Sequence, residues 1–196
     1  MLKLVLASKT PRRAELLKLA GYDFEIDPPA VREDVPCTAE SAGEAVKLVA
    51  LKKARSVVGR HKNAVVLSAD TVVICGGKVL GKPRDEREAF EMLSLLSGKA
   101  HEVVTGVALV EAATNAATTF HETSRVVFKE LSKEEVEAYV KSGEPLGKAG
   151  AYAIQGKAAL FVKRVEGCFY NVVGLPLARV YVELSKFGIR PRWAIS

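Results

Sequence analysis

The sequence predicts an α/β fold, in which helices pack against a sheet, and three observations support this prediction. Residues 65–67 and 72–74 form a nearly continuous apolar and β-branched run, which is typical of a strand covered on both faces. Residues 41–58 carry apolar side chains at helical spacing. Residues 101–111 and 118–128 alternate loosely between apolar and polar side chains, which favours an antiparallel pair partly covered by other elements.

Capping residues set the expected starts of three helices. Thr10 is the predicted N-cap of the first helix. Ser41 and Glu44 predict a capping box at the second helix, and a further box is expected at Ser132 and Glu135. In chain order, the predicted strands span residues 3–7, 22–26, 65–74, 78–80, 101–111, 118–128 and 159–166, and the predicted helices span residues 12–20, 41–58, 85–98, 132–141 and 175–187.

The central strand is interrupted by a charged residue and continues into a hairpin. Asp70 lies within the apolar run, where a carboxylate is costly unless it meets a cation, a metal ion or hydrogen-bond donors. Residues 76–77 are a Gly-Gly turn, and the register that follows places Thr71 opposite Lys82. The sequence therefore brings an acid, a hydroxyl and a lysine to one end of the hairpin. The alternative is that Asp70 ends the strand and caps a turn.

Two segments near the C-terminus lack a regular pattern. Residues 142–156 contain four glycines and a proline, so we expect a loop that brings backbone close to a ligand. Residues 188–196 are expected to form a frayed tail, with a docked Trp193 as the alternative. The whole chain, residues 1–196, is long enough to bury a sizeable core, either as one large domain or as two small lobes.

Composition restricts the classes of function. The net charge of +6 comes from basic residues spread along the chain, without basic runs interleaved with aromatic residues. The charge alone would fit a nucleic acid or a small anionic molecule equally well, but the pattern offers little support for a nucleic-acid-binding module. Salt-dependent binding of DNA or RNA would be the sign of such a module. The three cysteines have no CxxC spacing, which argues against a zinc site and a disulfide framework. No apolar segment reaches the roughly 18 residues that span a bilayer, and the N-terminus makes a poor signal peptide, so a cytoplasmic location without membrane attachment is expected.

The start of the first helix resembles an anion-binding cradle. Arg12 and Arg13 lie in its first turn, where the helix dipole disfavours cations. A bound anion reverses this effect, and the hydroxyls of Ser8 and Thr10 add donors beside the free N–H groups. The alternative is a solvated helix start that tolerates its arginines.

The second helix presents one lysine on its apolar stripe. Lys53 lies four residues from Val49 and from Val57, whereas Lys52 points away. A lysine on the inward face needs a partner or must reach the edge of the core, so Lys53 is a candidate site residue. The alternative is a lysine at the edge that covers apolar surface.

Two further candidates lie in loops. Glu33 follows an Asp-Pro-Pro segment and is a candidate catalytic or metal-binding acid, although such acids more often face water. Gln155 ends the glycine-rich loop and can both donate and accept hydrogen bonds, which suits reading the edge of a base. Its alternative is a surface residue in a turn.

Several motifs in order give the chain a family resemblance from Leu4 to about Phe187. They are ASKTPRR, EAVKLVALKKAR, SADTVV, GKPRD, LSGKAHEVVTG, EPLGKAGAYAIQG and NVVGLP. Together these motifs resemble the Maf family of nucleoside triphosphate pyrophosphatases. The combination of PRR, ADT and IQG is similar to the branch of that family that acts on dTTP and UTP.

The resemblance implies a fold and a reaction. The implied fold is an elongated mixed sheet flanked by helices, with a deep substrate cleft between two lobes. The implied reaction is hydrolysis of a nucleoside triphosphate between the α and β phosphates, which gives a monophosphate and pyrophosphate and removes unwanted nucleotides from the pool. The resemblance also implies a divalent metal cation, Mg²⁺ or Mn²⁺, and a homodimer.

The resemblance also implies roles for individual residues. Asp70 is similar to the family's proton acceptor, and we expect it to activate water directly or through a metal ion shared with Glu33. The remaining matched residues are expected to position the strongly anionic substrate by charge and hydrogen bonding. The implied catalytic residues are Asp70, Glu33, Lys53 and Lys82, the implied substrate-binding residues are Ser8, Arg12, Arg13, Thr71 and Gln155, and the implied metal ligands are Asp70 and Glu33.

Two other functions stay open at the level of sequence. One is the same chemistry on modified or methylated nucleotides, which a substrate panel would separate. The other is a nucleotide-binding regulator of cell division in which hydrolysis is incidental. A variant without the Asp70 carboxylate that kept the cellular effect would favour the regulator.

Overall fold

A seven-stranded mixed sheet organises the computed structural model, which describes residues 2–31 and 37–194. The strand order is β2-β1-β3-β5-β6-β7, and β4 pairs with β3 outside this series. Strand β1 pairs in parallel with both β2 and β3. The pairs β3–β4, β3–β5, β5–β6 and β6–β7 are antiparallel. The strands are β1 (Lys3–Leu6), β2 (Glu25–Ile26), β3 (Ala64–Cys75), β4 (Lys78–Leu80), β5 (Ala100–Glu111), β6 (Ala117–Phe128) and β7 (Val162–Glu166).

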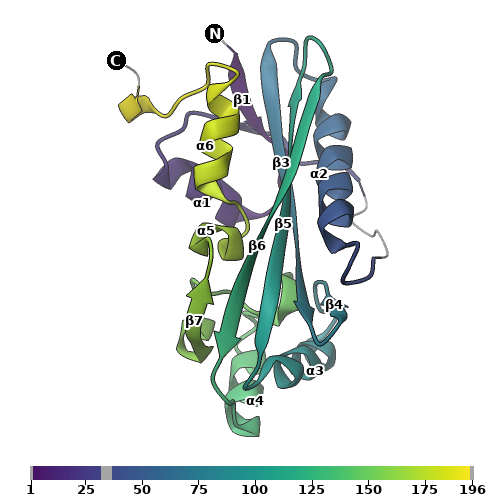
Figure 1. Ribbon diagram of the computed structural model, residues 1–196, viewed down its shortest axis with the longest axis vertical. Coiled ribbons are helices and arrows are strands. Elements are labelled where there is room, and N and C mark those ends of the chain that lie inside the picture. Colours follow the sequence, from purple (N-terminus) through teal and green to yellow (C-terminus); the bar gives the residue numbers. More distant parts are fainter. Residues whose placement is uncertain (1, 32–36, 195–196) are drawn as a thin grey trace.

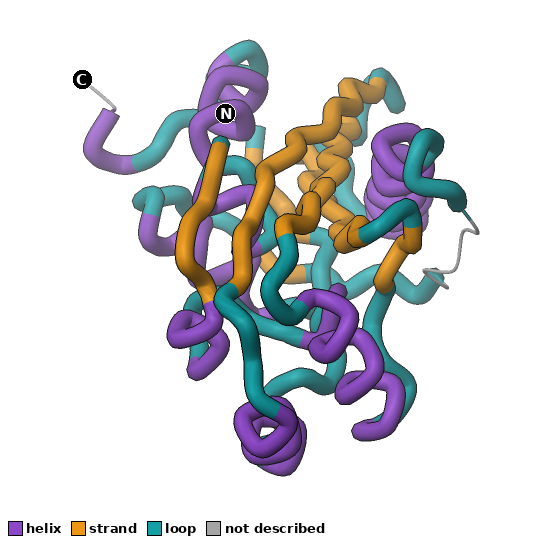
Figure 2. The backbone as a smooth tube through the Cα atoms, turned by 60° about the horizontal axis from the view of Figure 1, so that its bottom comes forward, coloured by secondary structure: helices purple, strands orange, loops and turns teal. Residues whose placement is uncertain are grey.

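Helices cover both faces of this sheet, as the views in Figures 1 and 2 agree. Helix α2 lies along one side of the long central strands, α1, α5 and α6 lie on the other side, and α3 and α4 lie at one end. This arrangement confirms the predicted α/β class. The helices are α1 (Pro11–Leu19), α2 (Ala42–Val58), α3 (Glu86–Leu96), α4 (Lys133–Lys141), α5 (Phe169–Val173) and α6 (Leu177–Ser185), with 3₁₀ segments at Ala149–Ala151, Lys157–Phe161 and Arg192–Ala194.

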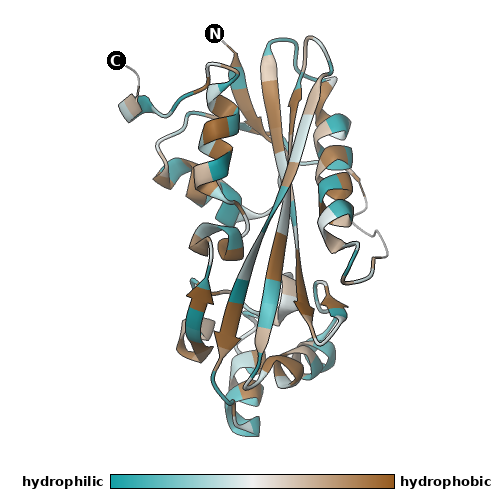
Figure 3. Ribbon diagram, viewed as in Figure 1, coloured by the Kyte–Doolittle hydropathy of each residue, from teal (hydrophilic) through white to brown (hydrophobic). Residues whose placement is uncertain are grey.

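The long strand β3 is buried on both faces, as its apolar run predicts. Val65 and Leu67 pack into the larger core beneath α1, α3 and α6, whereas Val66 packs into a second core beneath α2. Successive side chains of a strand point to opposite faces, so a strand between two helical layers needs apolar residues at every position. Figure 3 shows the result, with hydrophobic colouring along the central strands and alternating colouring on α2.

The structure corrects one of the two predicted capping boxes. Ser132 accepts a hydrogen bond from the backbone N–H of Glu135, and the Glu135 carboxylate accepts one from the backbone N–H of Ser132. Ser41 makes no such bond, because its backbone is helical and its hydroxyl accepts from the N–H of Thr38 instead. Glu44 pairs with Lys47. A capping residue needs extended backbone, which Ser132 has and Ser41 lacks.

Two predicted strands are shorter than expected. The N–H of Tyr22 donates to the carbonyl of Leu17, so residues 22–24 close the first helix and only Glu25–Ile26 join the sheet. Residues 157–161 form a 3₁₀ turn, and the strand that follows begins at Val162. Local turns at these positions use the backbone groups that a longer strand would need.

The C-terminal segment differs from the expected frayed tail as far as Ala194. Ile189 is buried, and Trp193 donates its indole N–H to the carbonyl of Ala20 at 2.9 Å. Arg192 forms an ion pair with Asp23. These contacts hold the tail against the end of α1. Within the described residues, no helix has the length and the apolar character required to span a bilayer.

Candidate active site

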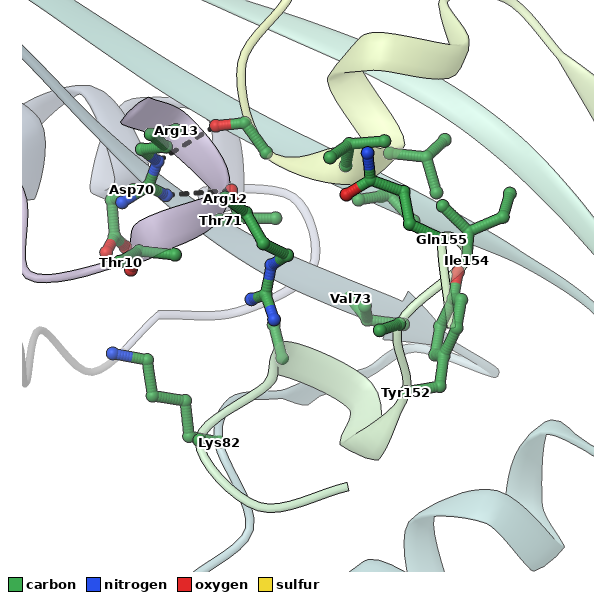
Figure 4. Close-up of a pocket in the computed structure, with 17 residues that line it drawn as sticks. Thr10, Arg12, Arg13, Asp70, Thr71, Val73, Lys82, Tyr152, Ile154 and Gln155 are labelled. Carbon is green, nitrogen blue, oxygen red and sulfur yellow. Dashed lines mark hydrogen bonds between the residues drawn. The ribbon is translucent and has the colours of Figure 1, made fainter. Parts of the chain in front are cut away.

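A pocket opens where α1, the β3–β4 hairpin, the loop of residues 142–156 and the end of α5 meet (Figure 4). Six of the nine site residues predicted from sequence line it, and two more, Ser8 and Lys53, contact residues of its wall. Glu33 lies in residues 32–36, outside the described residues. The lining residues are Thr10, Arg12, Arg13, Asp70, Thr71, Val73, Lys82, Val103, Gly147, Ala149, Tyr152, Ala153, Ile154, Gln155, Val172, Val173 and Gly174.

A carboxylate–lysine pair lies at one end of the pocket. Lys53, on α2, is 2% exposed and donates from Nζ to Oδ1 of Asp70, on β3, at 2.7 Å. Its Nζ also lies 3.4 Å from the carbonyl oxygen of Ala69. Lys53 is therefore on the inward stripe and not at the edge of the core. None of the described residues donates a hydrogen bond to Oδ2 of Asp70, so this oxygen can meet a ligand, water or a metal ion.

Arg13 is fixed by three hydrogen bonds from its guanidinium. Nε donates to the carbonyl of Gly174 at 2.9 Å, Nη2 donates to Oγ1 of Thr71 at 3.3 Å, and Nη1 lies 3.5 Å from Oγ of Ser8. The Ser8 hydroxyl also accepts from the N–H of Thr10 at 3.1 Å. Thr10 lies at the N-cap position, as predicted, but its side chain forms no capping bond. The start of α1 is therefore tied to β3 and to the end of α5.

Arg12 and Arg13 are adjacent in sequence, but whereas Arg13 is bonded to the wall, the side chain of Arg12 lies in the pocket. Figure 4 shows its side chain crossing the pocket from α1. Burial lowers the pKa of Arg12, and the nearby carboxylate of Glu15 opposes this shift. Burial and the charge of Arg12 also lower the pKa of Lys148, whereas Glu144 opposes that shift. Two cations that are partly stripped of water and lie near each other favour a bound anion, which would offset both penalties.

The glycine-rich loop is held in place by an acid that the sequence analysis did not identify. The carboxylate of Glu144 accepts from the Tyr139 hydroxyl at 2.9 Å and from the N–H of Lys157 at 3.2 Å. A Cβ on Gly156 would lie 2.3 Å from Oε1 of Glu144, so only glycine allows this approach. The N–H of Gly150 donates to the carbonyl of Gly81, which docks the loop onto the hairpin.

The far end of the pocket is apolar and suits a planar ring. Val103, Ile154 and Val173 line it together with Tyr152. The Tyr152 hydroxyl lies 2.9 Å from Nε2 of His101, which is 2% exposed. Gln155, the predicted reader of a base edge, lies at this end and is exposed. Sequence reasoning missed Tyr152 and His101, although both lie inside motifs that carry the family resemblance.

The carboxylates of the described residues determine how these residues could hold the implied metal ion. Among residues 2–31 and 37–194, no group of three or more His, Cys, Asp and Glu side chains could hold a metal ion. Asp70 is the one carboxylate that lines this pocket within those residues. Mg²⁺ usually binds through one or two carboxylates together with substrate phosphates and water, so this donor set fits such an ion once a phosphorylated ligand is bound.

Fold and site together define an α/β protein with a cationic pocket that has an acid–lysine pair at one end and an apolar end suited to a ring. The family model described as "Maf-like protein" matches residues 3–187, and the chain belongs to the Maf family. This finding confirms the family resemblance seen in the motifs.

Similar proteins span nearly the whole chain. Proteins named "dTTP/UTP pyrophosphatase" from Carboxydothermus hydrogenoformans and Pelotomaculum thermopropionicum are 51% and 50% identical, over 95% and 96% of this chain and 100% and 98% of theirs. One of the same name from Bacillus cereus is 49% identical over 96% of this chain and 97% of its own. A solved structure of a HAM1 protein from Coxiella burnetii has a TM-score of 0.50 at 18% identity, covering 95% of this chain and 100% of that one, and shows the fold alone.

Proposed function

We propose that this protein is a cytoplasmic enzyme that hydrolyses dTTP and UTP between the α and β phosphates, releasing the nucleoside monophosphate and pyrophosphate. Support comes from the name shared by relatives with about half of their residues identical. The observation that carries the proposal is the Asp70–Lys53 pair, which places inside a cationic pocket a carboxylate whose Oδ2 accepts no hydrogen bond from residues 2–31 and 37–194.

The proposed division of labour follows the charges of the pocket. Phosphoryl transfer depends on positioning and charge neutralisation, which cations can supply. Arg12 and Lys82 point into the pocket and are proposed to bind the phosphate chain. Arg13 is proposed to bind it from the side, as a guanidinium held in place by the wall.

Asp70 is the proposed general base. Lys53 occupies Oδ1 and so orients the carboxylate, which leaves Oδ2 to accept a proton from the water that attacks the α-phosphorus. The attacking water becomes an oxygen of the monophosphate, and the bond to the pyrophosphate leaving group breaks. A carboxylate on a strand, fixed by a buried lysine, meets the positional demand of such a base.

A divalent cation, Mg²⁺ or Mn²⁺, is part of the proposal. Asp70 and Glu33 are the proposed protein ligands in the alternative in which Asp70 activates water through the shared ion and not directly, and substrate phosphate oxygens would complete the coordination. When bound, such an ion neutralises charge on the phosphates and assists the departure of pyrophosphate.

The apolar end of the pocket is the proposed binding site for the base. Tyr152 and Val173 supply apolar and aromatic surface there. Gln155 can donate its side-chain amide N–H to a carbonyl oxygen of a uracil or thymine ring.

The test is pyrophosphate release from a panel of nucleoside triphosphates with Mg²⁺ or Mn²⁺, comparing the wild type with Asp70→Asn. We expect release from dTTP and UTP, and a loss of roughly 100-fold or more in kcat for the variant, because Asn keeps the size of the side chain and cannot act as the base. Asp23→Asn is the matched control, since Asp23 is exposed and lies away from the pocket. Turnover near the wild-type rate in Asp70→Asn would refute the mechanism, and release only from other triphosphates would refute the substrate.

A further inference from the structure

A buried chain of hydrogen bonds runs from Arg13 through two threonines to α5. Nη2 of Arg13 lies 3.3 Å from Oγ1 of Thr71, which lies 2.9 Å from Oγ1 of Thr105. Oγ1 of Thr105 lies 3.1 Å from the backbone carbonyl oxygen of Asn171. Thr105 and Asn171 are both 0% exposed, so solvent does not compete for the bond between them, whereas Thr71 is half-buried and lines the pocket.

The two end groups of this series of hydrogen bonds determine which hydroxyl donates to which. The carbonyl of Asn171 can only accept and the guanidinium of Arg13 can only donate. If Thr105 turned its single proton toward Thr71, two acceptor oxygens would face each other 3.1 Å apart in a site without water. Thr105 therefore donates to Asn171, and Thr71 donates to Thr105 while it accepts from Arg13.

The side chain of Asn171 keeps the terminal carbonyl in place. Its Nδ2 donates to the carbonyl of Val103 at 3.0 Å and to Oγ of Ser124 at 3.0 Å. Ser124 in turn donates to the carbonyl of Cys168 at 2.9 Å. The start of α5 is thus pinned to β5 and β6, so the acceptor that sets the direction of the chain does not move.

We propose that Thr105 and Asn171 act as positioning residues that make Thr71 a hydrogen-bond acceptor toward the pocket, so that Thr71 selects a ligand group that donates an N–H or O–H. This inference rests on the proposed function for the identity of the ligand. The single proton of Thr71 is engaged inside the wall, and only a lone pair of Oγ1 is left for the ligand. Thr71 is therefore unsuited to phosphate oxygens, which are acceptors, and suited to the nucleoside.

Two groups that dTTP and UTP share can serve as the donor. One is the N3–H of the base, which cytosine replaces with an acceptor. The other is the 3′-hydroxyl of the sugar. The 2′-hydroxyl is ruled out as the shared donor, because dTTP lacks it.

The test is the equilibrium binding of UMP, CMP and 3′-deoxyuridine monophosphate, which have no anhydride bond to hydrolyse. The proteins compared are the wild type, Thr105→Val, Thr105→Ser and Ser97→Ala. We expect the wild type to bind UMP about tenfold more tightly than at least one of the other two ligands, which corresponds to the free energy of one hydrogen bond. Thr105→Val removes the internal acceptor and frees the Thr71 proton to face the ligand. The ratio of the two binding affinities should therefore fall toward one.

The other variants separate positioning from simple destabilisation. Thr105→Ser keeps the hydroxyl and should keep the wild-type ratio. Ser97→Ala also removes a hydroxyl that both donates and accepts, at Leu131 and away from the pocket, and should leave the ratio unchanged. If Thr105→Val does not fold, Thr105→Ala gives the same test, because it removes the same hydroxyl and leaves Thr71 in place.

The outcomes are distinct from those for the proposed function. If Thr105→Val lowers the ratio of the affinities for UMP and CMP, the donor is the N3–H of the base. If it lowers the ratio of the affinities for UMP and 3′-deoxyuridine monophosphate, the donor is the sugar hydroxyl. Ratios that stay at the wild-type value in folded Thr105→Val overturn the inference, as does an absence of nucleotide binding. Binding ratios that behave as expected in a protein that releases no pyrophosphate would instead overturn the proposed reaction alone.

Discussion

The two walls of the pocket are built in opposite ways. The strand wall, formed by α1, α2 and β3, holds its charged groups by charge-assisted hydrogen bonds between regular elements, as in Lys53–Asp70 and Arg13–Thr71. The loop wall, residues 142–156, is held by backbone geometry and by a single acid, Glu144. The groups proposed for chemistry are therefore on the rigid wall, and Gln155, proposed to read the base, is on the loop.

The comparison also shows what each wall depends on. Removing a partner on the strand wall leaves a charge without its counter-charge, so substitutions there should act mainly through electrostatics. Adding bulk to the loop wall displaces a segment that fits closely against the hairpin, so substitutions there should act mainly through steric clashes. Variants that separate charge from bulk can test this difference.

The largest effect is expected when the strand wall loses its lysine. Lys53→Met keeps the length of the side chain and leaves the carboxylate of Asp70 without its partner. We expect a loss of about 3 kcal/mol in the free energy of unfolding, as for a broken buried ion pair. The kcat should fall by roughly 100-fold, because the proposed base is no longer oriented. Urea unfolding and steady-state kinetics measure the two quantities.

Lys52→Met is the matched control for this prediction. Lys52 is the preceding residue of the same helix and is exposed. The same substitution there should leave both stability and kcat close to wild type. Equal effects at positions 52 and 53 would contradict a special role for the buried pair.

The next effect is expected where the loop wall meets strand β5, at Tyr152 and His101. Burial lowers the pKa of His101 from 6.5 to about 4. The unfolded chain therefore binds this proton at higher pH than the folded protein does. The stability contribution is complete above pH 6.5 and is lost as the pH falls from 6.5 to 4, by about 3 kcal/mol in all.

His101→Phe is expected to remove this pH dependence. The variant keeps an aromatic ring against Phe128 but cannot bind the proton. The difference in unfolding free energy between variant and wild type, measured from pH 7 to pH 4, should therefore shift in favour of the variant as the pH falls. His121→Gln, at an exposed position, should show no such shift. A constant difference for His101→Phe across this range would argue against a buried neutral imidazole.

Much of the strand wall could be predicted from sequence, because its signals are local. The Gly-Gly turn predicts the hairpin register, and the structure pairs Val73 with Leu80 in that register. The pairing ends at Leu80, and both Thr71 and Lys82 line the pocket beyond it. Helical spacing places Lys53 on the inward stripe of α2, where it meets Asp70. Hydrophobic periodicity and turn-forming residues act over a few neighbouring positions, so both can be recognised in a single sequence.

Hydrogen bonds between side chains and backbone groups that are far apart in sequence could not be predicted in this way. His101 and Tyr152 are 51 residues apart in sequence, and Thr105 meets Asn171 across 66 residues. A polar side chain in an apolar segment indicates that it needs a partner, but not which partner the fold supplies. The failed capping box at Ser41 has a related cause, since the backbone conformation there is set by its bond to Thr38 and not by residue type alone.

The smallest of these effects is expected from bulk added to the loop wall. Gly150 has a φ of +66°, and a Cβ there would lie 2.8 Å from Cγ2 of Val73. Gly150→Ala should cost about 2 kcal/mol, from the positive φ together with the displaced valine. Gly147→Ala has a similar φ of +73° with nothing within 4 Å of its Cβ, so it should cost only about 1 kcal/mol. Because the loop carries Tyr152 and Gln155, Gly150→Ala should also raise KM for dTTP severalfold with little change in kcat, whereas Gly147→Ala should not. A fall in kcat with KM unchanged in Gly150→Ala would mean that the loop wall, and not the strand wall alone, positions the reacting groups.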